Sequence, residues 1–143
     1  MNHIRPTWDD IWMQYAKIIA TRSYDPRTQV GAIIVSEDNT TVLSLGYNGN
    51  YTSGPNVPDS AEPGKSGFIH AEINALIKAP FHYHKKKIMY ITLSPCFQCA
   101  KMIITAGIEK VVYDQEYRDT TGIELLTAQG VIIKHYKKKK QKL

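Results

Sequence analysis

Two short segments of the chain contain side chains that together could bind a metal ion. Residues 70–72 are His-Ala-Glu, and residues 95–99 are Pro-Cys-Phe-Gln-Cys. One imidazole and two thiolates form a set of three zinc ligands, and a catalytic zinc with three protein ligands leaves its fourth position to water. None of the other histidines has an obvious claim on that position. The two motifs therefore predict an open, catalytic Zn²⁺ site held by His70, Cys96 and Cys99.

Glu72 has the position expected of a proton carrier at such a site. A carboxylate two residues after a ligand, in a first helical turn, can reach a water on the metal without binding the metal. Zinc lowers the pKa of such a water to about 7, and the carboxylate accepts and redelivers the proton. A glutamate in a first turn is otherwise usually a surface residue. The pattern H-x-E followed by P-C-x-x-C, however, is typical of zinc nucleobase deaminases.

Both motifs are predicted to lie at helix starts. Ser94 is a good N-cap and Pro95 suits a first helical position, which places both cysteines on one face of the first turn. A helix N-terminus lowers the pKa of a thiol and so favours the thiolate that a metal needs. His70 begins a second helix, over about 69–79, with an inner face formed by Ile73, Leu76 and Ile77.

The remaining elements predict an α/β fold. A helix follows Thr7, whose hydroxyl and Asp10 form a capping box, and its apolar residues recur at helical spacing. They are Trp8, Ile11, Trp12, Tyr15, Ile18 and Ile19. Strands are expected over 29–35, 41–47, 88–93, 111–113 and 131–133, and helices over 97–106 and 122–128. A hairpin followed by alternating helices and strands predicts one mixed sheet of about five strands between helices, with the last strands parallel.

Composition and charge narrow the function classes. The chain has 143 residues, which favours one domain, expected over 1–136. Five of its 18 basic residues are lysines in a tail over 137–143, which leaves 13 basic and 13 acidic residues elsewhere. A neutral body argues against nucleic-acid binding. No segment is apolar enough for a membrane span or a secretion signal, and two closely spaced cysteines suit a reducing compartment, so we expect a cytoplasmic protein.

The chain resembles the deoxycytidylate (dCMP) deaminases of the zinc-dependent cytidine/deoxycytidylate deaminase family over most of its length. The matching blocks occur in the family's order, at 22–23, 29–32, 46–49, 70–75, 94–101, 106–108 and 111–113. The Gly-Tyr-Asn-Gly block at 46–49 is the most discriminating, because the zinc motifs are shared across the superfamily.

The resemblance implies hydrolysis of dCMP to dUMP and ammonia, which supplies dUMP for thymidylate synthesis. It implies that Glu72 deprotonates the water and protonates N3 of the ring. The Ala71 amide would donate to O2 of the pyrimidine, and Asn48 would contact the sugar. Deamination of cytidine or deoxycytidine, of guanine or of a tRNA base remains the alternative, and a non-enzymatic zinc-binding module is the second class.

The resemblance also implies a cation for the 5′-phosphate. Arg118 lies where the family has its phosphate-binding arginine, with Tyr117 beside it, and Arg22 is a second candidate. The planar guanidinium group suits phosphate. A phosphate-binding arginine favours the nucleotide over a nucleoside as substrate.

Regulation and assembly are further expectations from the resemblance. Members of the family are commonly hexamers, activated by dCTP and inhibited by dTTP, with Mg²⁺ on the triphosphate. The effector site is associated with Gly46, Tyr47, Asn48 and Gly49, and Lys65 is a further candidate contact. Some members bind a second, structural zinc near the loop over 50–67. Here that loop contains neither Cys nor His, so we expect one zinc per chain.

Overall fold

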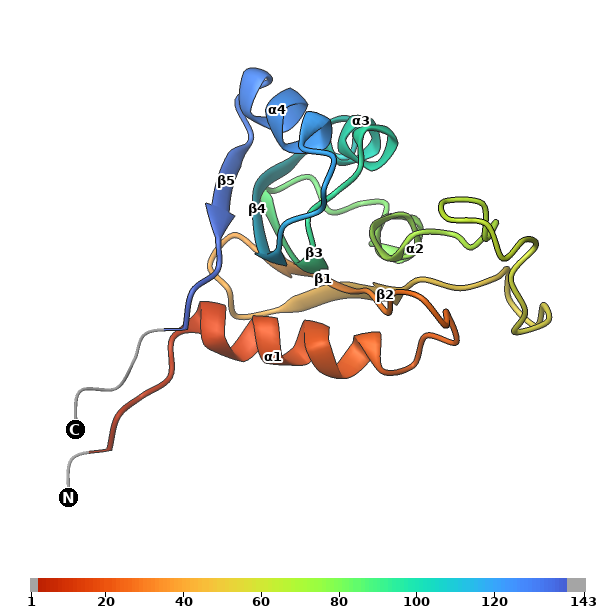
Figure 1. The fold of residues 1–143 in the computed structure, drawn as a ribbon. Helices are drawn as coiled ribbons and strands as arrows, with labels where there is room; N and C mark the ends of the chain where they lie inside the picture. Colours follow the sequence, from red (N-terminus) through yellow and green to blue (C-terminus); the bar gives the residue numbers. More distant parts are fainter. Residues whose placement is uncertain (1–2, 139–143) are drawn as a thin grey trace.

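The computed structural model describes residues 3–138, and these form a five-stranded mixed sheet between helices (Figure 1). In chain order the elements are α1 (Trp8–Ala20), β1 (Gly31–Ser36), β2 (Val42–Tyr47), α2 (Ala71–Lys78), β3 (Lys87–Leu93), α3 (Phe97–Thr105), β4 (Ile108–Gln115), α4 (Thr121–Ala128) and β5 (Ile132–His135). The predicted fold class is therefore confirmed.

The sheet combines an antiparallel half with a parallel half. Its strand order is β2-β1-β3-β4-β5. β1 runs antiparallel to both β2 and β3, whereas β3, β4 and β5 are mutually parallel. Each parallel connection needs a crossover, and α3 and α4 supply these crossovers. The predicted parallel arrangement of the last strands is thus confirmed.

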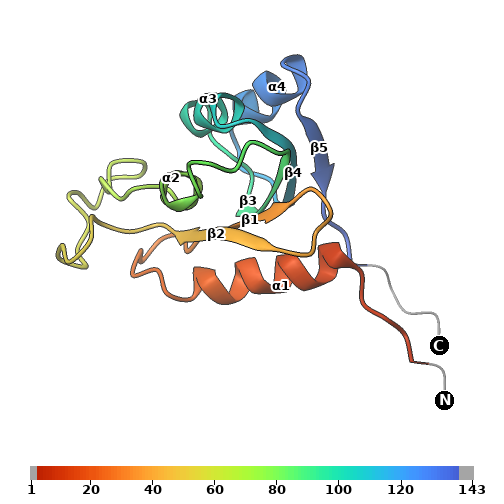
Figure 2. The same ribbon diagram turned by 180° about the vertical axis from the view of Figure 1, so that it is seen from behind.

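Helices cover both faces of the sheet. α1 lies on one face, and α2, α3 and α4 lie side by side on the other (Figures 1 and 2). Because side chains alternate along a strand, β3 serves both layers. Its residues Ile88 and Tyr90 pack with α1, and Met89 and Ile91 pack with the other three helices. The core is therefore two apolar layers separated by the sheet.

The buried face of α1 differs from the prediction. Its fully or nearly buried residues are Trp12, Met13, Ala16 and Ala20, whereas Trp8, Tyr15 and Ile18 of the predicted apolar face are 43%, 50% and 63% exposed. The reason is the close approach of the helix to β1. A Cβ atom on Gly31 would lie 2.0 Å from the carbonyl oxygen of Ala16, so small residues must line this contact.

The inner face of α2 also differs in part. Ala71, Glu72 and Ala75 are its buried residues, and Ile77 is 71% exposed, contrary to the prediction. A Cβ atom on Gly46 of β2 would lie 2.5 Å from the carbonyl oxygen of Ala71. The first turn of α2 is therefore pressed against the sheet, and its small residues and Glu72 point inward.

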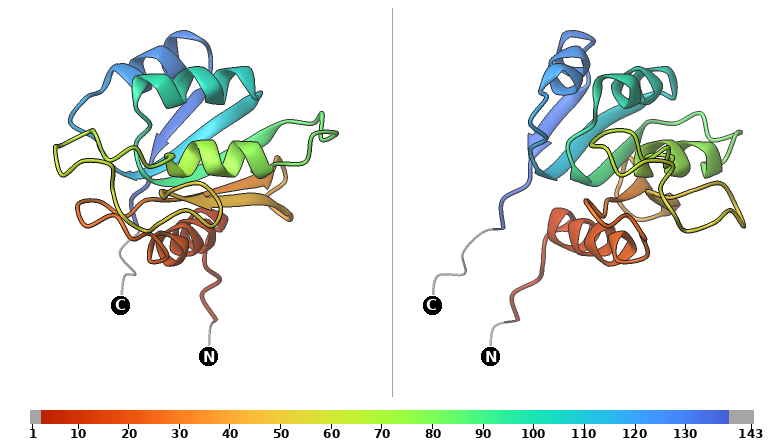
Figure 3. Two further views of the ribbon diagram at one scale, coloured as in Figure 1. Left: turned by 90° about the vertical axis from the view of Figure 1, so that its right-hand side faces the viewer. Right: turned by 45° about the vertical axis from the view of Figure 1, so that its right-hand side comes forward.

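The loop over 50–67 projects beside α2 (Figure 3). It contains no helix or strand, as its Pro- and Gly-rich composition predicts. Of the lysine-rich tail, residues 139–143 lie outside the described residues. Among residues 3–138, no helix combines the length and apolar character that crossing a membrane requires.

Candidate active site

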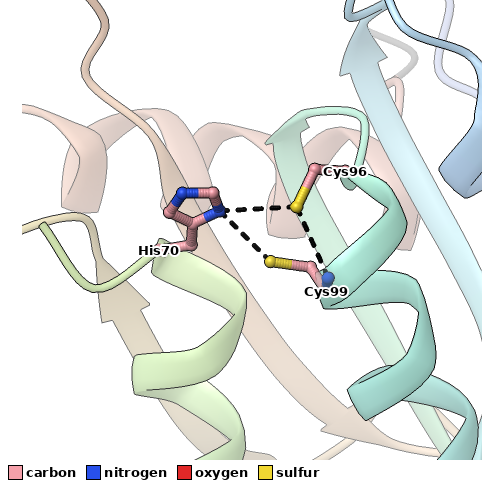
Figure 4. Close-up of side chains that lie close together, drawn as sticks. All are labelled: His70, Cys96 and Cys99. Carbon is pink, nitrogen blue, oxygen red and sulfur yellow. Dashed lines mark hydrogen bonds between the residues drawn. The ribbon is translucent and has the colours of Figure 1, made fainter. Parts of the chain in front are cut away.

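Three side chains with metal-binding atoms meet where α2 and α3 begin. His70 is the N-cap residue of α2, Cys96 is the N-cap of α3, and Cys99 lies in the first turn of α3. Nδ1 of His70 lies 3.2 Å from Sγ of Cys99 and 3.6 Å from Sγ of Cys96 (Figure 4). All three candidate ligand atoms lie within 4.8 Å of one another. An imidazole nitrogen and two thiolates at this spacing fit zinc, whose bonds to N and S measure about 2.0–2.3 Å.

The start of α3 differs from the prediction in a way that matters for the site. Ser94 is not the N-cap, because Sγ of Cys96 accepts the hydrogen bond from the backbone N–H of Cys99, at 3.4 Å. Oγ of Ser94 instead accepts from the backbone N–H of Tyr117, at 2.7 Å. That bond ties the loop after β4, which contains Arg118, to the loop that supplies Cys96.

Contacts within the cluster shift the pKa values of its two thiols in opposite directions. Hydrogen bonds from Cys99 and His70 lower the pKa of Cys96 to about 4, although burial opposes them. The bond to Cys96, together with burial, raises the pKa of the Cys99 thiol, and the bond to Cys96 raises the pKa of His70. A thiolate is the form that binds a metal, so the site favours the ligand form of Cys96.

Glu72 is buried beside the three ligands, with 4% of its surface exposed. Burial raises the pKa of its carboxyl to about 7, while a bond from its own backbone N–H and the nearby His70 partly oppose the rise. A carboxyl group with this pKa can accept and donate a proton near neutral pH. Such an acid–base group beside a metal-binding cluster is suited to hydrolysis.

A cavity of about 440 Å³ opens in front of this cluster. Its size is ordinary for a small-molecule site. The sequence-predicted residues that line it are Asn48, His70, Ala71, Glu72, Cys96, Tyr117 and Arg118. His70 and Cys96 of the metal cluster, the buried carboxyl and a guanidinium group thus share one cavity, although they come from different loops and helices, and Cys99 lies buried behind them.

Asn48 follows β2 directly and is buried, with 7% of its surface exposed. Its Oδ1 accepts the backbone N–H of Val30 at 2.8 Å. Its Nδ2 donates to the carbonyl of Thr28, at 2.8 Å, and to Oδ2 of Asp25, at 3.2 Å. The amide is therefore held on three sides by the loop that precedes β1.

The other sequence-predicted residues lie outside the cavity lining. The guanidinium of Arg22 lies over the ring of Tyr47, 6.0 Å from its centroid. Lys65 forms an ion pair with Glu62, at 2.7 Å, and Gly46 lets α2 approach β2. Gly49 pairs with Ile69 in an isolated β-bridge.

Several lining residues were not predicted from the sequence. They are Asp25, Arg27, Thr28, Val30, Glu62, Pro63, Gly64, Ser66, Phe68, Leu93, Ser94 and Glu116. No role in the site was predicted for residues 24–26, which follow the first helix. An Asp-Pro sequence is also a turn signal, because an aspartate side chain accepts hydrogen bonds from the backbone just after it. That signal could have drawn attention to Asp25.

Comparison with known proteins places this site in a family. A family model described as the zinc-binding region of cytidine and deoxycytidylate deaminases matches residues 6–115. The human deoxycytidylate deaminase is 37% identical over 122 residues, which cover 79% of this chain and 68% of that protein. A probable deoxycytidylate deaminase of Drosophila melanogaster is 36% identical over 126 residues, covering 78% of this chain and 62% of its own length.

A solved structure agrees with the sequence relatives. The dCMP deaminase of the cyanophage S-TIM5, in complex with dCMP and dUMP, superposes with a TM-score of 0.83 and 33% identity. The match covers 94% of this chain and all of that chain. The matched segment of the family model includes the metal cluster and Glu72. The chain therefore belongs to the cytidine and deoxycytidylate deaminase family.

Proposed function

We propose that the chain catalyses the hydrolytic deamination of dCMP to dUMP and ammonia. The observation that supports this most is one cavity that joins the His70, Cys96 and Cys99 cluster, the buried Glu72 and the guanidinium of Arg118. The S-TIM5 enzyme, which binds dCMP and dUMP, has the same fold over nearly all of this chain. The reaction would supply dUMP for thymidylate synthesis. It would take place in the cytoplasm, where the ligand cysteines stay reduced.

His70, Cys96 and Cys99 would hold one Zn²⁺. When bound, zinc supplies the Lewis acidity that makes a water molecule a nucleophile at neutral pH. Three protein ligands suit this role, since a fourth would close the site.

Glu72 would move the protons of the reaction. It accepts a proton from the attacking water and delivers it to N3 of the cytosine ring. It then transfers the second proton to the amino group on C4, whose bond to carbon breaks as ammonia leaves. The water oxygen forms the new bond to C4, so one water is consumed for each ammonia released. Burial, which brings the pKa of this carboxyl to about 7, equips it for both transfers.

Other groups of the cavity would orient the nucleotide. Ala71 is the first residue of α2, so its backbone N–H has no acceptor within the helix and can donate to O2 of the pyrimidine. Arg118, with Tyr117 beside it, would bind the 5′-phosphate, and Asn48 would contact the sugar. Arg27 also lines the cavity and adds a second guanidinium there, whereas Arg22 does not.

The test is an assay of the purified, zinc-loaded protein for ammonia and deaminated product. The substrates are dCMP, CMP, deoxycytidine and a cytosine-containing oligonucleotide. We expect dCMP to be the best substrate. Conversion of another substrate but not dCMP would keep the zinc chemistry and contradict the substrate assignment. If none of the four substrates is converted and the protein unfolds when zinc is removed, a non-enzymatic zinc-binding module would be favoured.

Regulation and assembly belong to the same proposal. dCTP, with Mg²⁺, would activate the enzyme and dTTP would inhibit it, through a site near residues 46–49 and Lys65. The chain would assemble as a hexamer, and an exposed apolar groove between α2 and α3, which includes Ile73, Leu76, Ile77, Met102 and Ala106, offers a surface for contact between subunits. Assays with each triphosphate and light scattering test these points, and a monomer indifferent to both nucleotides would contradict them.

A further inference from the structure

We propose that Asp25 is a positioning residue that holds the side-chain amide of Asn48 as a hydrogen-bond acceptor for the 3′-hydroxyl of the nucleotide. The inference deepens the proposed function and rests on it. It assigns to the loop between α1 and β1 a part in choosing the substrate.

One carboxylate organises this loop. Oδ1 of Asp25 accepts the backbone N–H groups of Arg27, at 2.8 Å, and Thr28, at 3.3 Å. Oδ2 of Asp25 accepts the Nδ2 group of Asn48, at 3.2 Å. Asp25 also lines the cavity. The same side chain therefore shapes its own turn and holds the amide of a residue at the end of β2.

Ser23 ties the main chain of Asn48 to the same loop. Its Oγ accepts the backbone N–H of Asp25, at 3.2 Å, and donates to the backbone carbonyl of Asn48, at 2.8 Å. Both Ser23 and Asn48 are buried. The position of the Asn48 side chain thus depends on the conformation of the loop over 23–28.

The hydrogen bonds of the Asn48 amide leave one acceptor position on Oδ1 unused. An amide has two N–H donors and an oxygen with two lone pairs. Thr28 and Asp25 take both donors, and the backbone N–H of Val30 takes one lone pair. The Val30 group can only donate and the Thr28 carbonyl can only accept, so the amide cannot turn over without losing both bonds. One lone pair of Oδ1 is left for a ligand.

That lone pair selects the chemistry of the ligand group. A hydroxyl can donate to it, whereas a pyrimidine carbonyl or the oxygens of a phosphate dianion cannot. A deoxyribonucleoside 5′-monophosphate has a single hydroxyl, on C3′. That hydroxyl therefore fits Asn48, and the phosphate fits the guanidinium groups of Arg27 and Arg118 that line the cavity.

A carboxylate at position 25 is needed because it offers acceptors on both oxygens. The Asp25→Asn variant keeps the shape but has only one acceptor oxygen. Its N–H₂ group must then face either Nδ2 of Asn48 or the N–H groups of Arg27 and Thr28. We expect the loop that holds Thr28 and Val30 against the Asn48 amide to shift in this variant, because Asp25 organises that loop, and the preference for a 3′-hydroxyl to fall with it.

The test compares two substrates that differ only in that hydroxyl, dCMP and 2′,3′-dideoxycytidine 5′-monophosphate. For the zinc-loaded full chain we expect kcat/KM to favour dCMP about tenfold or more. The Asn48→Ala variant should bring the ratio close to one, and Asp25→Asn should lower it by about threefold or more. Because both constants come from one preparation, the ratio does not depend on the fraction of protein that is folded.

Asp38→Asn is the matched control. Asp38 also organises a turn, by accepting from the Ser36 hydroxyl and from the N–H and hydroxyl of Thr40, but it lies between β1 and β2 and does not line the cavity. Its variant should keep the wild-type ratio. An unchanged ratio in Asp25→Asn, with both substrates slowed equally, would overturn the proposal.

A binding measurement separates this proposal from the proposed function. Calorimetry gives the Kd ratio of dUMP to 2′,3′-dideoxyuridine 5′-monophosphate, without turnover. If the wild-type protein does not deaminate dCMP, the proposed function fails. If it does, and Asp25→Asn binds the two nucleotides with the wild-type ratio, only the role of Asp25 fails. A ratio that falls in Asp25→Asn and in Asn48→Ala alike supports the proposal.

Discussion

Two parts of the cavity lining are built in different ways: the part around the metal cluster, called the metal end, and the part around Asn48, called the sugar end. At the metal end, His70 and Cys96 cap two adjacent helices, and Cys99 and Glu72 lie in the first turns of those helices. At the sugar end, Asn48 is held by side-chain and backbone groups from a loop about 20 residues earlier in the chain. The metal end depends on helix starts, and the sugar end depends on hydrogen bonds between loops.

The residues that act in the reaction are thus built into the fold differently from those that select the nucleotide. Helix starts are rigid and need only short sequence spacings, which suits ligands that must keep a fixed geometry around zinc. Loops tolerate changes of sequence better than the elements that they connect. Damage at the metal end should therefore abolish turnover, whereas damage at the sugar or phosphate end should change which nucleotide is used.

The largest expected effect is that of removing zinc. Treatment with a chelator should abolish deamination, and zinc alone should restore it. If zinc binds the folded chain at 1,000 times its Kd, its loss costs about 4 kcal/mol of stability, or on the order of 10–15 °C in Tm. Differential scanning calorimetry and metal analysis check this. A chelated protein that keeps its activity would contradict the metal assignment.

The Glu72→Gln substitution should have the next largest effect on activity. The amide fills the same space but cannot accept the proton from water, so kcat should fall about 10²–10⁴-fold. Zinc content should stay at one per chain, because Glu72 lies outside the ligand cluster. Ammonia release and metal analysis of the same sample measure both quantities. A kcat within tenfold of wild type would remove Glu72 from the chemistry.

The Arg118→Ala substitution should change the preference for a nucleotide over a nucleoside. Loss of the guanidinium should lower kcat/KM for dCMP by about 10–100-fold, and leave deoxycytidine, which has no phosphate, nearly unchanged. Arg22→Ala is the matched control, since it removes the same charge outside the cavity lining. If the two variants lose activity on dCMP equally, Arg118 is not the specific phosphate ligand.

The smallest effect lies far from both ends, where α1 meets β5. Asp9 accepts hydrogen bonds from Lys134 and from the Tyr90 hydroxyl, at 2.7 Å. Burial raises the pKa of Asp9, but the bonds from Lys134 and Tyr90 together outweigh it, so the pKa lies below the ordinary 3.8. The unfolded chain then binds the proton more readily, and stability falls as pH drops below about 4.

Asp9→Asn should remove that part of the acid sensitivity, because the variant has no carboxyl group to protonate there. Urea unfolding of both proteins between pH 3 and 7 measures the free energy of unfolding at each pH. Zinc release at low pH affects both proteins equally, so it cancels in the comparison. The variant should lose less stability than wild type on the acid side, and its activity at pH 7 should be unchanged. Parallel pH profiles of the two proteins would show that Asp9 keeps an ordinary pKa.

The sequence predicted the metal end better than the sugar end, for a physical reason. Ligand spacing within a helical turn is local, so His70, Cys96 and Cys99 could be grouped before the fold was known. Even there the N-cap was misplaced at Ser94, because a cysteine side chain took that role. The exposure of Ile18 and Ile77 was missed because close backbone approach at Gly31 and Gly46 is a tertiary property.

The sugar end shows what local patterns leave out. The resemblance pointed to Asn48, but two of its partners, Asp25 and Thr28, lie in a loop for which the sequence predicted no part in the site. The role of Asp25 depends on a contact with a residue 23 positions later, which no periodicity encodes. The fold class, by contrast, followed from the order of hairpin, helices and strands, and is confirmed.

A crystal structure of zinc-loaded Glu72→Gln with dCMP tests the central claim most directly, that the two ends of one cavity hold one nucleotide. We expect anomalous scattering from zinc at His70, Cys96 and Cys99, and C4 of the base beside position 72. The 3′-hydroxyl should lie within hydrogen-bond distance of Oδ1 of Asn48, and the phosphate should contact Arg118. A nucleotide bound with its phosphate at Asn48, or outside this cavity, would contradict the account.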